Sequence, residues 1–164
     1  MSLVLDGSAG VTFPAGSNAQ GAPSKVLQVV SSTNTTNANN STNTYADTGL
    51  TASITPLFST SKILVLISAQ IGTSGYSSGL NPIVNVQLVR NSTSIYLVSS
   101  TSYNYASGSG GISINIPMSI SYLDSPATTS STTYKIQWKT ASGNNASFNG
   151  DAGQSTITLM EIAQ

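Results

Sequence analysis

The stretch Ile112-Ser113-Ile114-Asn115-Ile116-Pro117-Met118-Ser119-Ile120-Ser121-Tyr122 has the pattern that decides the fold of this chain. From Ile112 to Tyr122 every second residue is apolar or aromatic, and the intervening residues are Ser and Asn apart from Pro117. Successive side chains of a β-strand point to opposite faces, so this alternation predicts a strand with one face buried. Pro117 cannot donate to a sheet ladder, so we expect this strand to lie at a sheet edge or to be split in two.

Strand-like segments continue on both sides of this stretch. Tyr134, Ile136 and Trp138 share one face of a later segment, which places Trp138 in the core rather than at a binding surface. Residues 63–71 form the most apolar run, and we expect a central strand there with both faces buried. Further short strands are expected at 25–30, 50–54, 84–89, 95–98, around Phe148 and at 156–162.

The fold class follows from the number of these segments and from the lack of helical periodicity. Eight or so short strands with polar turns between them indicate an all-β protein. One isolated sheet would leave its apolar face in water, so two layers are required. We therefore predict a jelly-roll-like antiparallel β-sandwich, whose strand order is not readable from the sequence. The polar stretch 31–44, rich in Ser, Thr and Asn, is expected to be a long loop or a sheet edge.

The first 24 residues differ from the rest of the chain. Two short apolar segments, 3–5 and 11–13, are separated by small residues and followed by a stretch of Gly, Ala and Ser. We predict an extended N-terminal arm over residues 1–24 and a β-sandwich domain over residues 25–164. A frayed terminus is the alternative interpretation of residues 1–24.

Charge is unusually scarce in this sequence. Its 164 residues include five basic and five acidic side chains, so 6% are charged and the net charge is zero, against about 25% charged in an average protein. Nucleic-acid binding depends on neutralising phosphates, so we expect no nucleic-acid partner. A near-neutral surface tends to associate, which suits a subunit of an assembly. No apolar run is long enough to span a membrane, and the N-terminus does not resemble a signal peptide, so we expect assembly in a cytoplasm.

The titratable residues offer little chemistry. The chain has no Cys and no His, which removes the commonest general base and the commonest transition-metal ligands. The acidic residues are Asp6, Asp47, Asp124, Asp151 and Glu161. They are not paired in sequence, and we expect structural roles for them. Glu161 lies near a strand end, where we expect it to meet a Lys or Arg. We predict no catalytic residue, cofactor or metal site. A glycosidase pair assembled from distant loops is the remaining enzymatic alternative.

Three tyrosines are the residues best suited to ligand contact. Tyr76, Tyr103 and Tyr105 lie in segments of small residues, and the loops of a rigid sandwich commonly carry recognition. We predict them as contacts to a receptor or glycan. Packing against the rim of the sandwich or against a neighbouring subunit is the alternative.

The chain resembles small trimeric β-sandwich structural proteins of tailed bacteriophages, of the tail-fibre and head-decoration type. Nearly the whole chain takes part, through three stretches: Leu3-Val4-Leu5-Asp6-Gly7 with residues 10–17; residues 29–33 with 54–56 and 59–65; and residues 121–126, 134–137 and 155–162. Each motif alone is of low complexity, and their order together carries the resemblance.

The resemblance implies a virion component, commonly a homotrimer, released by lysis and attached by its N-terminal arm. On this basis we expect virion anchoring through Leu3, Leu5, Val11 and Phe13. The primary hypothesis is a short tail-fibre or receptor-binding subunit that contacts baseplate or tail proteins and a host surface glycan. The alternative is a capsid decoration protein bound to the major capsid protein, and the third hypothesis is a polysaccharide depolymerase. No catalytic residue carries over from the resemblance.

Overall fold

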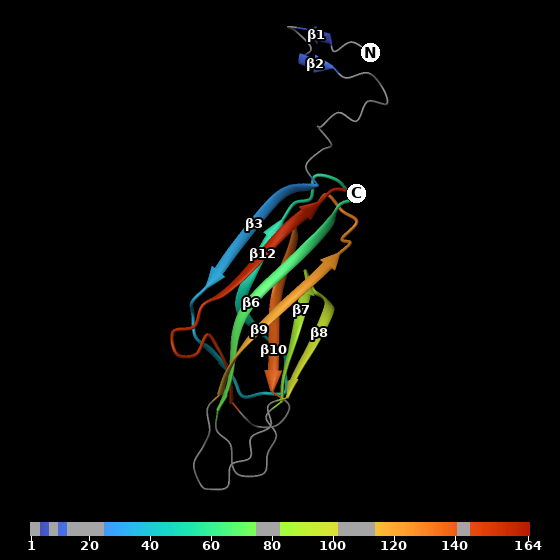
Figure 1. The fold of residues 1–164 in the computed structure, drawn as a ribbon. Coiled ribbons are helices and arrows are strands. Elements are labelled where there is room, and N and C mark those ends of the chain that lie inside the picture. The colour runs from blue at the N-terminus through green and yellow to red at the C-terminus, as the bar shows by residue number, and fades with distance from the viewer. Residues whose placement is uncertain (1–3, 7–9, 13–24, 75–82, 102–113, 141–144) are drawn as a thin grey trace, which may run out of the picture.

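The computed structural model describes residues 4–6, 10–12, 25–74, 83–101, 114–140 and 145–164, and these residues contain strands and turns but no helix (Figure 1). The strands, in chain order, are β1 (Val4–Asp6), β2 (Gly10–Thr12), β3 (Val26–Asn34), β4 (Ala38–Asn40), β5 (Ala46–Ile54), β6 (Lys62–Ser74), β7 (Ile83–Arg90), β8 (Thr93–Thr101), β9 (Ile114–Asp124), β10 (Thr132–Thr140), β11 (Asn145–Phe148) and β12 (Ser155–Ile162).

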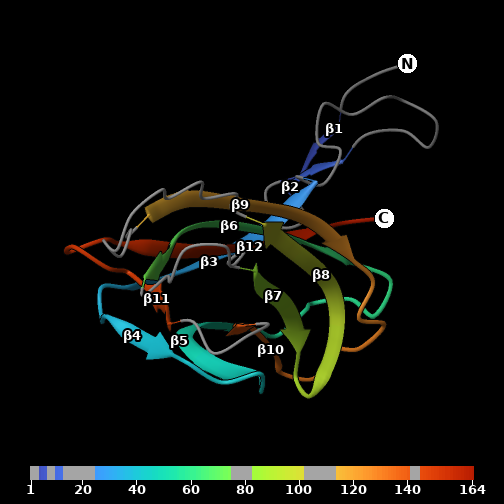
Figure 2. The same ribbon diagram turned by 90° about the horizontal axis from the view of Figure 1, so that it is seen from below.

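Two antiparallel sheets form the sandwich (Figure 2). One has the order β3-β12-β6-β9, and β11 and β4 continue it beside the later part of β6. The other has the order β5-β10-β7-β8. Eight antiparallel strands exchanged between two sheets in this order make a jelly roll. The predicted fold class is confirmed, and the strand order is now defined.

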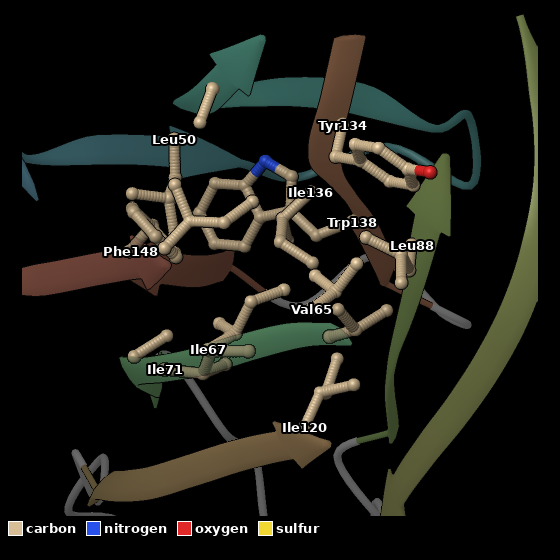
Figure 3. Packing of buried hydrophobic residues seen from close by; sticks show 14 of the residues in the cluster. Leu50, Val65, Ile67, Ile71, Leu88, Ile120, Tyr134, Ile136, Trp138 and Phe148 are labelled. Atoms are coloured by element: carbon tan, nitrogen blue, oxygen red, sulfur yellow. The ribbon is translucent and has the colours of Figure 1, made fainter. Parts of the chain in front are cut away.

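The core lies between the sheets and is built by alternation. In β10 every second residue from Thr132 to Thr140 is buried, and in β12 every second residue from Ser155 to Glu161 is buried. Trp138 is 1% exposed and meets Phe148 edge-on at 6.0 Å between ring centroids (Figure 3). The prediction that Trp138 belongs to the core is confirmed.

The expectation that residues 63–71 are buried on both faces is wrong. β6 is a central strand, between β12 and β9, but its residues alternate. Ile63, Val65 and Ile67 are buried against the second sheet, whereas Leu64 and Leu66 on the outer face are only half-buried. Within a single chain this sheet is an outer layer, so an apolar run here cannot be covered on both sides.

Two other local predictions are settled by the pairing. β9 carries Pro117 and pairs with β6 alone among the described strands, so it is an edge strand as expected. The polar stretch 31–44 is partly loop and partly sheet edge, because it includes the end of β3 and all of β4, the two outermost strands in the order β3-β12-β6-β11-β4. Its Asn40 Nδ2 donates to the carbonyl oxygens of Thr44 and Trp138, at 3.1 and 3.0 Å. Side-chain amides of this kind satisfy backbone groups that a short strand leaves unpaired.

Within residues 1–24 the structure describes two short strands. β1 and β2 pair antiparallel, with Leu5 opposite Val11. The sequence did not predict that these two apolar segments pair with each other. The division into an arm (1–24) and a sandwich domain (25–164) stays a prediction.

Candidate functional site

One end of the sandwich gathers the strand ends between which the predicted recognition loops run. β6 ends at Ser74, which is paired with Asn145 at the start of β11. β8 ends at Thr101, which is paired with Ile83 at the start of β7. Ile114 at the start of β9 is paired with Thr73. Residues 75–82, 102–113 and 141–144 therefore all connect strands at this end, which we call the loop end (Figure 1).

The opposite end is where residues 1–24 join the sandwich, and we call it the arm end. The backbone N–H of Ala163 donates to the carbonyl oxygen of Lys25 at 2.8 Å. Lys62, at the start of β6, is paired with Ile162 at the same end. β6 is thirteen residues long, so at about 3.3 Å per residue the two ends lie about 40 Å apart.

The structure positions the predicted site residues only through their attachment points. Tyr76, Tyr103 and Tyr105 fall outside the described residues, in segments that begin and finish at the loop end. Leu3 and Phe13 also fall outside the described residues. For Leu5 and Val11 the structure gives the backbone pairing alone. Their roles in recognition and anchoring stay predictions.

The described part of the loop end contains an apolar pocket that the sequence did not predict. Its volume is about 150 Å³, and it opens between the edge strands of the two sheets, β8 and β9. The lining residues are Ile71, Thr73, Val84, Val98, Ser99, Ile116, Pro117 and Met118. The Thr73 hydroxyl is buried and makes no hydrogen bond. These side chains can take up a small apolar group, but they include no acid or base for catalysis.

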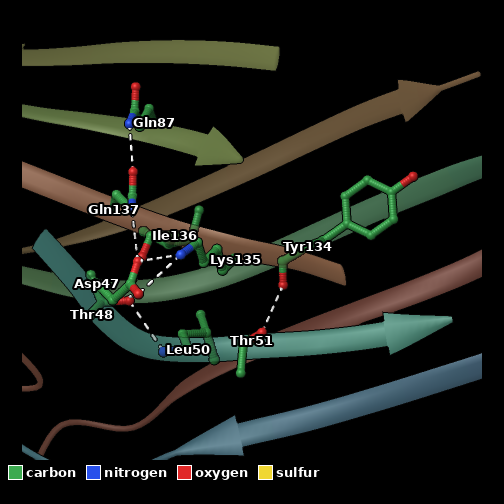
Figure 4. Close-up of polar contacts among 9 residues, drawn as sticks. All are labelled: Asp47, Thr48, Leu50, Thr51, Gln87, Tyr134, Lys135, Ile136 and Gln137. Atoms are coloured by element: carbon green, nitrogen blue, oxygen red, sulfur yellow. Dashed lines mark hydrogen bonds and ion pairs between the residues drawn. The ribbon is translucent and has the colours of Figure 1, made fainter. Parts of the chain in front are cut away.

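On the outer face of the second sheet, Asp47 anchors a chain of polar side chains (Figure 4). Lys135 Nζ lies 2.8 Å from its carboxylate, and Gln137 Nε2 donates to it at 2.7 Å. Gln87 Nε2 then donates to Gln137 Oε1 at 2.7 Å. The hydrogen bond from Lys135 is the main cause that lowers the pKa of Asp47. This carboxylate is therefore held ionised in a structural role.

Asp124 and Glu161 are the buried carboxylates among the described residues. Arg90 Nη1 lies 2.9 Å from both carboxylate oxygens of Asp124, and the Tyr134 hydroxyl donates to one of them at 2.6 Å. Burial of Tyr134 and its hydrogen bond to Asp124 raise the pKa of this tyrosine well above its ordinary value. A tyrosine in this state stays protonated and serves to join β10 to the end of β9.

Glu161 is fully buried and does not meet a Lys or Arg, so that expectation is wrong. Its carboxylate accepts hydrogen bonds from Gln28 Nε2 at 2.6 Å and from the backbone N–H groups of Leu57 and Phe58 at 2.8 and 3.3 Å. Burial acts to raise the pKa of Glu161, but these hydrogen bonds outweigh it and lower the pKa. Neutral donors replace a cation here, and no local pattern in the sequence indicates them.

Asp47, Asp124, Glu161 and Asp151 therefore all have structural partners, since Asp151 accepts from Asn115 Nδ2. Within the described ranges no three His, Cys, Asp or Glu residues gather as a metal site would require. Nor does the described part of the chain include a helix long and apolar enough to cross a membrane.

No protein-family model matches the chain, and no curated protein matches it. Among solved structures it is similar to the VP2 subviral particle of infectious bursal disease virus, with 14% identity, a TM-score of 0.40, and coverage of 85% of this chain and 39% of that chain. It is also similar to a structure of the Gt strain of that virus, with 9% identity, a TM-score of 0.41 and the same coverage. The chain thus spans about two-fifths of the length of these proteins. Similarity at this level does not identify a function.

Proposed function

We propose that this chain is a non-enzymatic structural protein of a bacteriophage virion, and specifically a short tail-fibre or receptor-binding subunit. Residues 1–24 attach it to baseplate or tail proteins, and the loop end faces the host surface. Tyr76, Tyr103 and Tyr105 contact a surface glycan. The subunit acts as a homotrimer without a cofactor.

The observation that supports this proposal is that the two ends of the sandwich differ. Residues 1–24 join it at the arm end, and the segments that bear the three tyrosines join it at the loop end. The strand β6, about 40 Å long, runs from one end to the other. An attachment segment and a recognition surface need this separation, because a subunit bound by one end must present the other to its target. The resemblance to phage structural proteins agrees with this arrangement.

Cryo-electron microscopy of the intact particle tests the location. We expect threefold density at the tail or baseplate, with the arm end toward the particle. Density spread over the head would overturn the tail assignment and favour capsid decoration. In that case purified heads should bind the protein and gain resistance to heat.

Binding to host cells tests the loop end. We expect Tyr103→Ala and Tyr105→Ala to reduce binding, because stacking of an aromatic ring on a sugar face is lost. Tyr96→Ala is the matched control, since Tyr96 lies on β8 with its ring 5.4 Å from that of Tyr122. Unchanged binding by both loop variants would show that the tyrosines are not the contact. Release of oligosaccharide from host glycan would instead favour a depolymerase.

A further inference from the structure

A row of apolar side chains crosses the outer face of the β3-β12-β6-β9 sheet near the arm end. The sheet register places Val29, Met160, Leu64 and Leu123 side by side, one from each strand. We call these four residues the apolar row. Val29 is 54% and Leu123 is 50% exposed, and the two residues between them are half-buried. Apolar side chains aligned across neighbouring strands form a continuous surface.

Toward the loop end the neighbours of the apolar row carry no charge, and at the arm end Lys62, which is paired with Ile162, is its charged neighbour. The next row toward the loop end consists of Ser31, Thr158, Leu66 and Ser121, and the one after it of Thr33, Thr156, Ser68 and Ser119. Apart from Leu66 in the first row, both rows consist of hydroxyl-bearing residues. Toward the arm end, Val26 is paired with Ile162 beyond the apolar row and is exposed as well.

The outer face of the other sheet is different. The corresponding row there is Asp47, Gln137, Gln87 and Leu97, and its first three members are joined by hydrogen bonds (Figure 4). Lys135 adds a second charge beside Asp47. One outer face thus carries a charged and hydrogen-bonded row, whereas the other carries an apolar row. A contiguous apolar surface on one side of a soluble protein usually marks an interface.

The apolar run of β6 supports the same conclusion. Residues 63–71 have the composition of a strand buried on both faces, yet a single chain buries only one of them. The inward residues Ile63, Val65 and Ile67 face the core, and nothing within the described chain covers Leu64 and Leu66 completely. The composition of β6 is the one expected of a strand whose outer face is covered by a further layer.

We propose that this outer face, centred on the apolar row, is the surface through which copies of the chain associate with one another. This deepens the proposed function, on which it rests for the existence of an oligomer. An identical copy brings the same apolar row and the same hydroxyl-bearing rows, and the long side chain of Lys62 at the arm-end rim keeps its ammonium group in water. The net charge of the chain is zero, so copies do not repel one another at long range.

The flat area of the face corresponds to a small interface between copies. Four strands about 4.8 Å apart and seven residues at about 3.3 Å each give about 440 Å² of flat sheet, roughly half of the 800 Å² that each partner buries in a standard interface. Side-chain relief and the exposed Val26 add to this area.

Sedimentation velocity of the purified full-length chain tests the proposal. We expect the unchanged protein to be an oligomer and Val29→Lys/Leu123→Lys to be a monomer at the same concentration, with a dissociation constant raised about a hundredfold or more by the buried ammonium groups. Both positions are half exposed, so the substitutions are compatible with folding, which circular dichroism verifies. Thr51→Lys/Leu97→Lys is the matched control, because it adds the same charge to exposed positions on the other sheet.

Thiol accessibility gives a second readout, since the chain has no cysteine of its own. In the oligomer, Leu123→Cys should react with a maleimide at least tenfold more slowly than Leu97→Cys. An oligomer that survives Val29→Lys/Leu123→Lys, with Leu123→Cys fully reactive, would place the interface elsewhere and leave the proposed function intact. A monomeric unchanged protein would overturn self-association itself. Monomers that bind particles through this face would assign it to another virion protein.

Discussion

Gln28, in the first strand of the sandwich, donates a 2.6 Å hydrogen bond to the carboxylate of Glu161 in the last strand, 133 positions later. The same Nε2 group donates to the carbonyl oxygen of Thr55 at 2.7 Å. The other carboxylate oxygen of Glu161 accepts from the backbone of Leu57 and Phe58. One buried carboxylate therefore fixes β3, β12 and the connection between β5 and β6 at the arm end.

We expect Glu161→Gln to destabilise the sandwich by about 1–3 kcal/mol, because the amide that replaces one oxygen cannot accept from Gln28 and leaves a buried donor unpaired. Urea unfolding, followed by the fluorescence of the single Trp138, measures the change. Asp47→Asn is the matched control, because its carboxylate is largely exposed and should cost less than about 1 kcal/mol. Equal losses in the two variants would contradict the structural role of Glu161.

The same carboxylate predicts how stability depends on pH. The pKa of Glu161 is lower in the folded chain than its ordinary value of 4.5. In that range the unfolded chain binds more protons, so stability rises with pH. The contribution is complete above the ordinary pKa and is lost as the pH falls through the lowered value. Unfolding measured from neutral pH down to about pH 3 should therefore show a steeper acid loss in the unchanged protein than in Glu161→Gln. Parallel curves would exclude Glu161 as a source of the loss.

Tyr134→Phe tests the buried contact between β10 and the end of β9. The variant loses the 2.6 Å hydrogen bond to Asp124, which keeps its ion pair with Arg90. We expect a loss of about 1–2 kcal/mol in the free energy of unfolding. Tyr122→Phe is the control, because it retains the ring contact with Tyr96. If Tyr134→Phe lost no more stability than the control, the Tyr134 hydroxyl would contribute little.

The turn between β7 and β8 depends on Asn91, whose φ is 54°. Its backbone N–H donates to the carbonyl oxygen of Thr133 at 2.7 Å, and its Oδ1 accepts from the N–H of Thr133 at 2.9 Å. We expect Asn91→Ala to cost about 2 kcal/mol, because it combines an unfavourable left-handed backbone with a lost hydrogen bond. Asn91→Gly relieves the backbone alone and should cost less in thermal unfolding. If both variants lost the same stability, backbone conformation would not contribute.

Local patterns in the sequence predicted the strands and part of the core. Alternation placed Trp138 inside, and Pro117 placed its strand at an edge, because both features depend on a few neighbouring residues. The order in which strands pair does not depend on a few neighbouring residues. Glu161 and Gln28 are brought together by the jelly-roll connections, so no spacing in the sequence indicates the contact.

The same reasoning explains why the prediction that β6 is buried on both faces was wrong and why the site was predicted only in part. Leu64 and Leu66 made the strand look buried on both faces, because the apolar composition of a strand does not show which of its faces packs against the core. The loop end was not predictable, because it depends on which strands begin and finish together. Tyr76, Tyr103 and Tyr105 were selected for their residue type and surroundings, and the structure adds where their segments attach.

Deleting residues 1–20 tests the division of the chain and the anchoring role together. β1 pairs with β2, whereas the ladders of the sandwich are made by residues from Val26 onward. We therefore expect the truncated protein to keep its free energy of unfolding within about 0.5 kcal/mol and to lose attachment to the particle. A substantial loss of stability would move the boundary of the sandwich domain toward the N-terminus.

Point variants separate the apolar contacts from the mere presence of the arm. We expect Leu3→Asp/Phe13→Asp to abolish attachment in a particle-binding assay, because a charge cannot be buried without a partner. Ser8→Asp/Ser17→Asp adds the same charge at polar positions and should still attach. If the truncated protein attached normally, the anchoring hypothesis would be wrong. If both point variants failed to attach, negative charge alone would weaken binding and the apolar residues would not be the specific contacts.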